Sequence, residues 1–264
     1  MTLSLPALAN LVALDISPIG TVTYEAFTGT EVPPYLQSKI AGIDWIGTDE
    51  QPNLEKLALL KPDLILGLEK QHQQIYAQLS QIAPTVMLES DRAQWQQLFL
   101  EVAAVVGQTS EAEQLLQNYE QRVEALREAL GEQGLEQEIS VAYILGSDIY
   151  AEPQNSFAGS ILQDVGLKRP PAQSVKVAAN SRLIFSKERL DIIDGDVLFV
   201  PKSGSDLDDD QEAFMKTPLW QTLTAVQQGR VYRVNLWEWT GLDILAAHKV
   251  LNDLFQHLID EPPS

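Results

Sequence analysis

Two segments of this chain resemble each other closely enough to limit how the chain can fold. They read NLEKLALLKPDLILG at 53–67 and SKERLDIIDGDVLFV at 186–200, and they align without a gap. Glu55 matches Glu188, and apolar positions match apolar positions through both copies. Each copy reads as a short helix, a two-residue turn and a buried strand. A repeated unit of this kind builds two similar lobes, so we predict a two-lobed molecule.

Strand-like and helix-like runs alternate along both halves of the chain, which is typical of α/β architecture with Rossmann-like lobes. The predicted strands are Ile19–Thr23, Ile43–Gly47, Asp63–Gly67, Pro84–Leu88, Ile139–Leu145, Asp196–Val200 and Val231–Val234. The predicted helices between and after them include Asn53–Leu60, His72–Gln81, Gly159–Asp164, Lys187–Ile193 and Leu242–Leu258.

The middle of the chain has a helical pattern almost throughout. Apolar residues recur at helical spacing from Trp95, and Ser110 with Glu113 forms a capping box. A helix over Glu111–Leu130 would be about 30 Å long, enough to run across two lobes. We therefore predict an N-terminal lobe at 1–91, a helical connection at 92–134, a C-terminal lobe at 135–264 and a ligand cleft between the lobes.

Composition excludes several classes of function. Of 264 residues, 37 are Asp or Glu and 18 are Lys or Arg, which gives a formal net charge of −19. Such a chain repels phosphate backbones and anionic membrane surfaces, so we expect no nucleic acid partner. It has no cysteine, and its first basic residue is Lys39, so it carries no disulfide and no signal-peptide pattern. Any export signal would lie outside this chain.

The sequence offers no catalytic signature and no metal-ligand pattern. It lacks the phosphate-binding glycine loops, the paired-histidine zinc motif and the serine nucleophile motif. His248 and His257 are nine residues apart on one predicted helix and would face opposite sides. The acidic run at 206–210 lacks the glycine turn of a calcium loop and reads as a solvated loop. We expect a binding protein, not an enzyme, with no catalytic residue and no side-chain metal ligand.

Aromatic and cationic residues follow the predicted strands, where α/β sheets bind their ligands. Aromatic walls with a few cations suit a bulky, partly apolar ligand that bears polar or anionic oxygens. The alternative for either tryptophan of the NLWEWT segment is packing into the core. The predicted ligand-binding residues are Trp237, Trp239, Tyr150, Phe157, Arg182, Lys202, Lys70, His72 and Tyr24.

Nearly the whole chain resembles the substrate-binding proteins of bacterial iron–siderophore ABC importers. The resemblance lies in VPPYLQSKIAGIDWIGTDEQPNLEKLALLKPDLILG, IYAQLSQIAPTV, YILGSDIYAEPQNSFAGSILQDVGL, FSKERLDIIDGDVLFV and PLWQTLTAVQQGRVYRVNLWEW. It implies two α/β lobes joined by one long helix, and a periplasmic or lipid-anchored protein. It also implies that Glu55 and Glu188 dock onto arginines of a permease dimer. One departure is that the first helix begins by about Leu5, so the preceding strand is missing or very short.

Three hypotheses follow. In the first, the protein is a monomer without a cofactor, and it carries a ferric siderophore whose iron touches no side chain. In the second, the cargo is haem or a corrinoid, with His72 or Tyr150 as an axial ligand of haem. In the third, the chain is an enzyme or chelatase on a similar two-lobed fold, with convergent ionisable groups of perturbed pKa. The acidic composition favours a neutral or weakly charged cargo.

Overall fold

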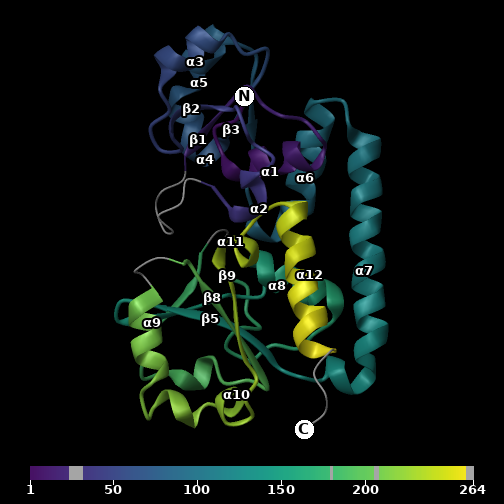
Figure 1. The fold of residues 1–264 in the computed structure, drawn as a ribbon, viewed down its shortest axis with the longest axis vertical. Coiled ribbons are helices and arrows are strands. Elements are labelled where there is room, and N and C mark those ends of the chain that lie inside the picture. Colours follow the sequence, from purple (N-terminus) through teal and green to yellow (C-terminus); the bar gives the residue numbers. More distant parts are fainter. Residues whose placement is uncertain (24–31, 179–180, 205–207, 260–264) are drawn as a thin grey trace. The chain divides into compact units, whose positions relative to one another are not determined.

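The structure is a computed structural model, and it describes residues 1–23, 32–178, 181–204 and 208–259. The chain forms two compact units (Figure 1). The N-terminal unit comprises Met1–Gln117 and Leu242–Leu245, and the C-terminal unit comprises Asn118–Gly241 and Ala246–Ser264. The separate helical connection at 92–134 remains a prediction, because the boundary between the compact units falls within its residues.

The N-terminal unit is built on parallel strands. β1 (Gly20–Thr23) pairs with β2 (Asp44–Thr48), and β3 (Ile65–Leu68) pairs with β4 (Thr85–Leu88). The first three residues join the two pairs, because Thr2 N–H donates to Gly20 O at 3.1 Å and Leu3 N–H donates to Leu66 O at 2.8 Å. Residues 1–3 therefore lie between the two pairs, where Thr2 forms an isolated parallel bridge with Leu66.

Helices cover both faces of these strands (Figure 1). Ile65 packs with residues of α3 (Leu54–Leu60) and α5 (Tyr76–Ile82) on one face. Leu66 and Leu68 pack with residues of α1 (Leu5–Ala13) and α6 (Trp95–Val105) on the other. The apolar run of β3 therefore supplies both faces, as expected for a buried parallel strand. The remaining helices of this unit are α2 (Pro34–Gln37), α4 (Glu69–His72), η1 (Gln73–Ile75) and η2 (Arg92–Gln94).

The long helix α7 (Thr109–Leu135) runs from the N-terminal unit into the C-terminal unit. It confirms the predicted helix over 111–130. Gly131 has non-helical angles, with φ at 60°, where glycine avoids the strain that a side chain would cause. Among the described residues, no helix combines the length and apolarity needed to cross a bilayer.

The C-terminal unit contains a five-stranded sheet in the order β7-β6-β5-β8-β9. Three of its strands are parallel, and β6 and β7 extend the sheet in antiparallel fashion. These two strands were not among the strands predicted from the sequence. The strands are β5 (Ile139–Leu145), β6 (Asp148–Ala151), β7 (Leu183–Ser186), β8 (Val197–Lys202) and β9 (Val231–Asn235).

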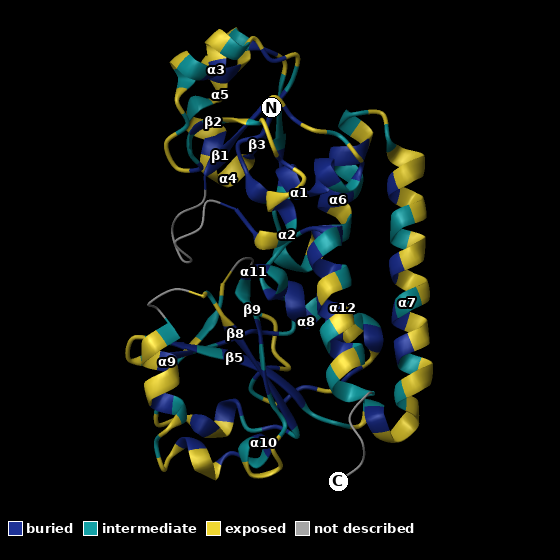
Figure 2. Ribbon diagram, viewed as in Figure 1, coloured by how far each residue is buried: buried dark blue, intermediate teal, exposed yellow. Residues whose placement is uncertain are grey.

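The two faces of this sheet are covered differently. Ala142, Ile144, Leu198 and Val200 pack in a core cluster with Phe214 and other residues of the segment 190–225. That segment forms η3 (Leu190–Ile192), α9 (Asp208–Met215), η4 (Trp220–Thr222) and α10 (Thr224–Gln227). The helices α8 (Phe157–Val165), α11 (Leu236–Trp239) and α12 (Ile244–Leu258) complete the unit, and all three bury apolar side chains (Figure 2).

The two copies of the sequence repeat do not have the same structure. The first copy forms the α-helix α3, then β3, as predicted. In the second copy the predicted helix at 187–193 is wrong, because only the short 3₁₀ helix η3 forms there. Ser186 belongs to β7 and pairs with Asp148, so the strand uses the residue at which a helix would start.

Candidate ligand-binding site

The predicted ligand residues that the structure describes lie in strands, beside strand ends or in the helices that follow, and their burial separates them into two groups. Trp239, Phe157 and His72 are 1% exposed, and Trp237 is 9% exposed. Lys70 and Lys202 are exposed, and Tyr150 and Arg182 are partly exposed. Tyr24 lies outside the described residues. Only the second group presents its side chains at the surface of its unit.

Trp239 is a core residue of the C-terminal unit. Its indole Nε1–H donates to Asp253 Oδ2 at 2.7 Å, and its ring stacks on Phe199 at 4.5 Å between centroids. Burial is the main cause that raises the pKa of the Asp253 carboxyl, and this hydrogen bond opposes the rise. In the structure Trp239 thus packs in the core, as its alternative expects, and its contact with a ligand stays a prediction.

Phe157 is also buried in the core. It is the first residue of α8, whose N-cap Ser156 accepts a hydrogen bond from Gly159 N–H at 3.0 Å. The cap fixes the start of α8, so Phe157 points into the unit, where 1% of it is exposed. The structure places Phe157 in the packed interior of its unit, and its role as a ligand wall stays a prediction.

His72 has a structural role in the N-terminal unit. Its Nδ1 accepts a hydrogen bond from Leu68 N–H at 2.9 Å, and its Nε2 lies 2.9 Å from Asp49 O. A neutral ring that donates from Nε2 satisfies both contacts. Both ring nitrogens contact backbone groups in this structure, so neither is open to a ligand or to haem iron unless these contacts break.

The corner around His72 also contains groups that the sequence did not single out. Asp49 follows β2 and accepts a hydrogen bond from Gln71 Nε2 at 3.3 Å. Burial raises the pKa of the Asp49 carboxyl, and the hydrogen bonds that it accepts oppose this rise. Lys70 lies exposed on α4, beside Gln71 in the chain. This corner offers a cation and an amide at the carboxyl ends of β2 and β3.

In the C-terminal unit, Tyr150 and Arg182 lie on neighbouring strands or next to them. Tyr150 stacks on Tyr143 with 5.4 Å between ring centroids and 12° between ring planes. Arg182 lies just before β7, and its Nε is 3.4 Å from Oε1 of Glu152, a carboxylate that is 2% exposed. The guanidinium is thus held at one side by a buried partner. The side chain keeps 26% of its surface exposed.

Glu55 and Glu188, the predicted docking residues, are both exposed. Glu55 lies in the first turn of α3, where Asn53 Oδ1 caps the helix by accepting from Lys56 N–H at 2.9 Å. Glu188 accepts a hydrogen bond from Ser186 Oγ at 2.7 Å. The repeat therefore gives two exposed carboxylates on different local structures.

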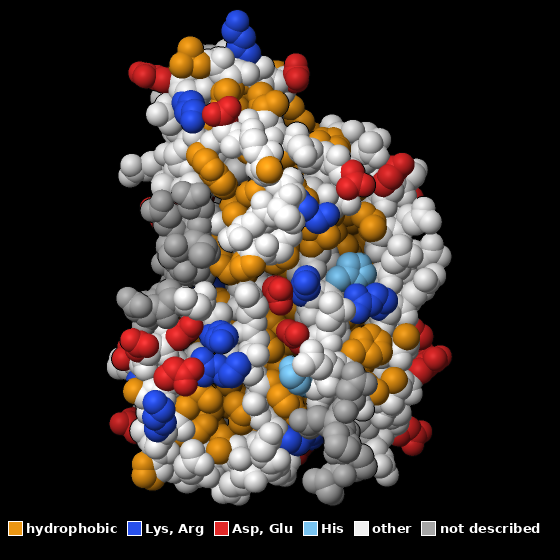
Figure 3. All heavy atoms as spheres, viewed as in Figure 1, with side chains coloured by type: hydrophobic (Ala, Val, Ile, Leu, Met, Phe, Trp, Pro, Cys, Tyr) orange, Lys and Arg blue, Asp and Glu red, His pale blue; other side chains and the backbone are white. Residues whose placement is uncertain are grey.

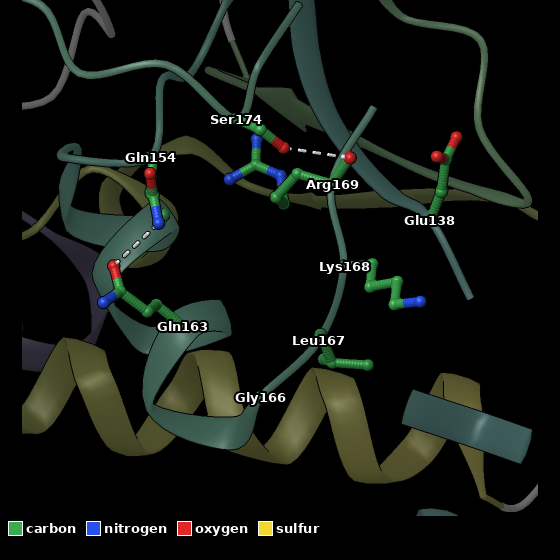
Figure 4. A pocket seen from close by; sticks show the side chains of 9 residues that line it. Glu138, Gln154, Gln163, Gly166, Leu167, Lys168, Arg169 and Ser174 are labelled. Atoms are coloured by element: carbon green, nitrogen blue, oxygen red, sulfur yellow. Dashed lines mark hydrogen bonds between the residues drawn. The ribbon is translucent and has the colours of Figure 1, made fainter. Parts of the chain in front are cut away.

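A cavity of about 380 Å³ lies in the C-terminal unit near the amino ends of its parallel strands (Figure 4). Glu138 precedes β5, and Gln154 follows the antiparallel β6, so the cavity is at the amino ends of the parallel strands. Gln154 Nε2 donates to Gln163 Oε1 at 3.2 Å, and Ser174 Oγ donates to Arg169 O at 3.1 Å. The Nη2 of buried Arg169 donates to Glu152 O at 2.7 Å. These contacts hold a loop against the sheet.

The surface carries mixed charge. Figure 3 shows acidic and basic side chains intermixed with apolar ones on the face in view. Within the described residues, no group of three or more His, Asp or Glu side chains is arranged to hold a metal ion. The acidic run at 206–210 is described only from Asp208, at the start of α9.

Comparison with known proteins gives the class. The model of the periplasmic binding protein family matches residues 24–235. The chain therefore belongs to the periplasmic binding protein family.

Its relatives include proteins named for siderophores. The achromobactin-binding periplasmic protein of Dickeya dadantii is 32% identical over 265 residues, which covers 96% of this chain and 84% of that one. A probable siderophore-binding lipoprotein of Bacillus subtilis, YfiY, is 32% identical over 254 residues, which covers 92% of this chain and 77% of that one. The fold matches Staphylococcus aureus SirA in complex with staphyloferrin B, with a TM-score of 0.84 and 24% identity over 97% of this chain and 91% of SirA.

Proposed function

We propose that this protein binds a ferric siderophore complex and delivers it to an ABC-type permease for iron uptake. The observation that carries the proposal is the 32% identity to a siderophore-binding periplasmic protein over 96% of the chain. Relatives named as periplasmic proteins and as lipoproteins support a location outside the cytoplasmic membrane. We further propose that the protein is a monomeric carrier and not an enzyme.

We propose that four side chains contact the complex. Lys70 would contribute from the N-terminal unit, and Arg182, Lys202 and Tyr150 from the C-terminal unit. All four lie at or near strand ends and are at least partly exposed. Cations of this kind bind carbonyl or anionic oxygens of a chelator, and the tyrosine ring packs against its apolar parts. In this proposal the siderophore wraps the iron, so no side chain coordinates it.

Glu55 and Glu188 are proposed to dock onto basic residues of the permease dimer. Their exposure and their matched positions in the two repeat copies support this role. The competing interpretation is that Glu55 only stabilises α3, because a negative charge in the first turn favours the helix N-terminus. A permease assay with Glu55→Gln and Glu188→Gln separates the two, since only docking would reduce transport while ligand binding stays intact.

The test of the proposal is a titration of tryptophan fluorescence with a ferric hydroxamate, ferric citrate, a ferric catecholate and haemin. We expect saturable quenching by one ferric class. A Soret shift with haemin and no response to any ferric complex would instead support the haem hypothesis, with Tyr150 as the remaining predicted axial ligand. The absence of any response would contradict both.

A further inference from the structure

The cavity of about 380 Å³ in the C-terminal unit has a polar lining that none of the roles proposed above uses. Most of the lining comes from α8 and from the loop that follows it, as Figure 4 shows. Its volume lies within the range of pockets that hold small ligands. The polar side chains in the lining are Glu138, Gln154, Gln163, Lys168, Arg169 and Ser174.

Arg169 places a poorly compensated charge beside this cavity. The residue is 7% exposed, and its Nη2 donates to Glu152 O at 2.7 Å and to Gln173 Oε1. Among the described residues, its Nε and Nη1 have no hydrogen-bond acceptor, and almost no solvent reaches them. Burial lowers the pKa of the guanidinium to about 10, so it stays protonated at neutral pH. A buried cation with unused N–H groups is costly unless a negative charge lies near it.

The buried carboxylate that acts on Arg169 is shared with a second cation. Glu152 is 2% exposed, and its charge opposes the effect of burial on the pKa of Arg169. The same carboxylate lies 3.4 Å from Arg182 Nε. The three groups together therefore carry one net positive charge, and solvent screens this charge only weakly at buried Arg169.

The rim of the cavity supplies groups that can donate hydrogen bonds to oxygen atoms. Lys168 is exposed, and its ammonium pairs with exposed Glu136. A surface ion pair of this kind contributes little stability, so the ammonium can turn to another partner at small cost. Gln154 Nε2 donates to Gln163 Oε1 at 3.2 Å, and each of these two amides has further N–H groups to offer.

Glu138 is the acidic side chain of the lining. Its carboxylate points away from Lys168 in Figure 4. With Lys168 and Arg169, the lining carries two positive charges against one negative charge. The cavity therefore favours an anion over a cation, although the chain as a whole has a formal net charge of −19.

We propose that this cavity binds a small oxyanion: a carboxylate, sulfate or phosphate. The oxygens of the anion accept hydrogen bonds from the Lys168 ammonium and from the amides of Gln154 and Gln163. The buried charge of Arg169 attracts the anion through the protein interior, where the effective dielectric constant is lower than in water. The site requires no iron complex, so it stands independently of the proposed cargo.

The test is the thermal unfolding midpoint of the whole chain in sodium malonate, sulfate or phosphate, against sodium chloride at equal ionic strength. We expect an oxyanion to raise the midpoint with a dependence on concentration that fits a single site. Sulfate and phosphate also stabilise proteins through exclusion from their surface, but that effect shows no sign of a filled site. A rise of that general kind alone, or no rise above the chloride control, would overturn the proposal.

Two variants at the cavity should change the apparent dissociation constant in opposite directions. Gln163→Glu places a negative charge at the exposed rim and should weaken oxyanion binding about tenfold, whereas Glu138→Gln removes one and should tighten it about threefold. Gln221→Glu is the matched control, because Gln221 is exposed in η4 and outside the cavity lining. Equal effects of Gln163→Glu and Gln221→Glu would contradict the site.

Two further variants test where the oxyanion binds. Arg169→Met removes the buried charge and should abolish the single-site response in protein that still unfolds cooperatively. Lys202→Gln removes a proposed cargo contact and should leave the response unchanged. If Lys202→Gln abolished the response instead, the oxyanion would bind among the proposed cargo residues, and the cavity site would be ruled out.

Discussion

The two copies of the repeat are similar in sequence and differ in structure. Position by position, Asn53 matches Ser186 and Leu59 matches Ile192. Asn53 caps an α-helix, whereas Ser186 ends a β-strand. Leu59 is 80% exposed, and Ile192 is 1% exposed. The local structures diverge at this point because β7 ends at Ser186, the residue that matches the cap of α3 in the other copy.

That difference separates the chemistry of the units. The N-terminal unit keeps a plain parallel sheet whose strands are covered by helices on both faces. The antiparallel strands of the C-terminal unit create a sheet surface with stacked tyrosines and an anchored arginine. These two strands thus give the C-terminal sheet a surface for which the N-terminal strand pairs have no counterpart among the described residues.

The largest expected effect is on the free energy of unfolding, at the matched apolar positions Leu59 and Ile192. Ile192→Ala should lower the free energy of unfolding of the C-terminal unit by about 2–5 kcal/mol, because it empties space in a packed core. Leu59→Ala should change the free energy of unfolding of the N-terminal unit by about 0.5 kcal/mol or less. Urea unfolding, with hydrogen exchange to assign the loss to a unit, measures both. Similar losses at the two positions would contradict the burial difference.

A second prediction concerns the tryptophan pair on α11. Trp239→Phe removes the hydrogen bond between the buried indole and half-buried Asp253 and should cost about 1–3 kcal/mol of stability. Its effect on binding of any ferric complex should be small once the fraction of folded protein is taken into account. Thermal unfolding and ligand titration of the same variant check this. A loss of affinity in fully folded protein would return Trp239 to the ligand site.

A smaller difference in stability is expected between the matched residues Asn53, which caps α3, and Ser186, which ends β7. Asn53→Ala should destabilise the N-terminal unit by about 1 kcal/mol, because Lys56 N–H loses its acceptor at the start of α3. Ser186→Ala should cost less than about 0.5 kcal/mol, since its hydroxyl bonds only to exposed Glu188. Unfolding midpoints in urea distinguish them, and a larger loss for Ser186→Ala would contradict the assigned local structures.

The smallest expected effect is a pH dependence in the N-terminal unit. Burial raises the pKa of Asp49 in the folded state, so folding favours its protonated form. Its contribution to stability is greatest below the pKa of the unfolded chain and is lost as pH rises through the folded pKa. Asp49→Asn should therefore be more stable than wild type at pH 7, with the gain shrinking toward pH 4. A gain that grows on acidification would reverse the assignment.

Much of this fold could be predicted from the sequence, and the failures have physical causes. Periodicity predicted the seven parallel strands and the long helix, because those elements bury regular apolar patterns. It missed β6 and β7, although Gly146 and Ser147 between YIL and DIY carry a two-residue hairpin signal. Gly146 has φ at 58°, as such a turn requires.

The candidate site was harder to predict, because residue type at a strand end does not determine burial. Trp239 and His72 have the chemistry of ligand residues, but tertiary contacts occupy their polar atoms. Tyr143 and Ile184 were not predicted as site residues, because they lie beside Tyr150 only through β6 and β7, which were not predicted from the sequence. Local pattern predicts elements, and pairing between distant elements decides which side chains remain at the surface.

The short segment Leu242–Leu245 belongs to the N-terminal unit although the residues on both sides of it belong to the C-terminal unit. Asn10 Nδ2 donates to Leu242 O at 3.4 Å, and Tyr35 OH donates to Asp243 Oδ2 at 2.9 Å. Neither unit is thus encoded by one uninterrupted stretch of the gene. A fragment expressed as 1–117 would therefore lack a piece of its own packing.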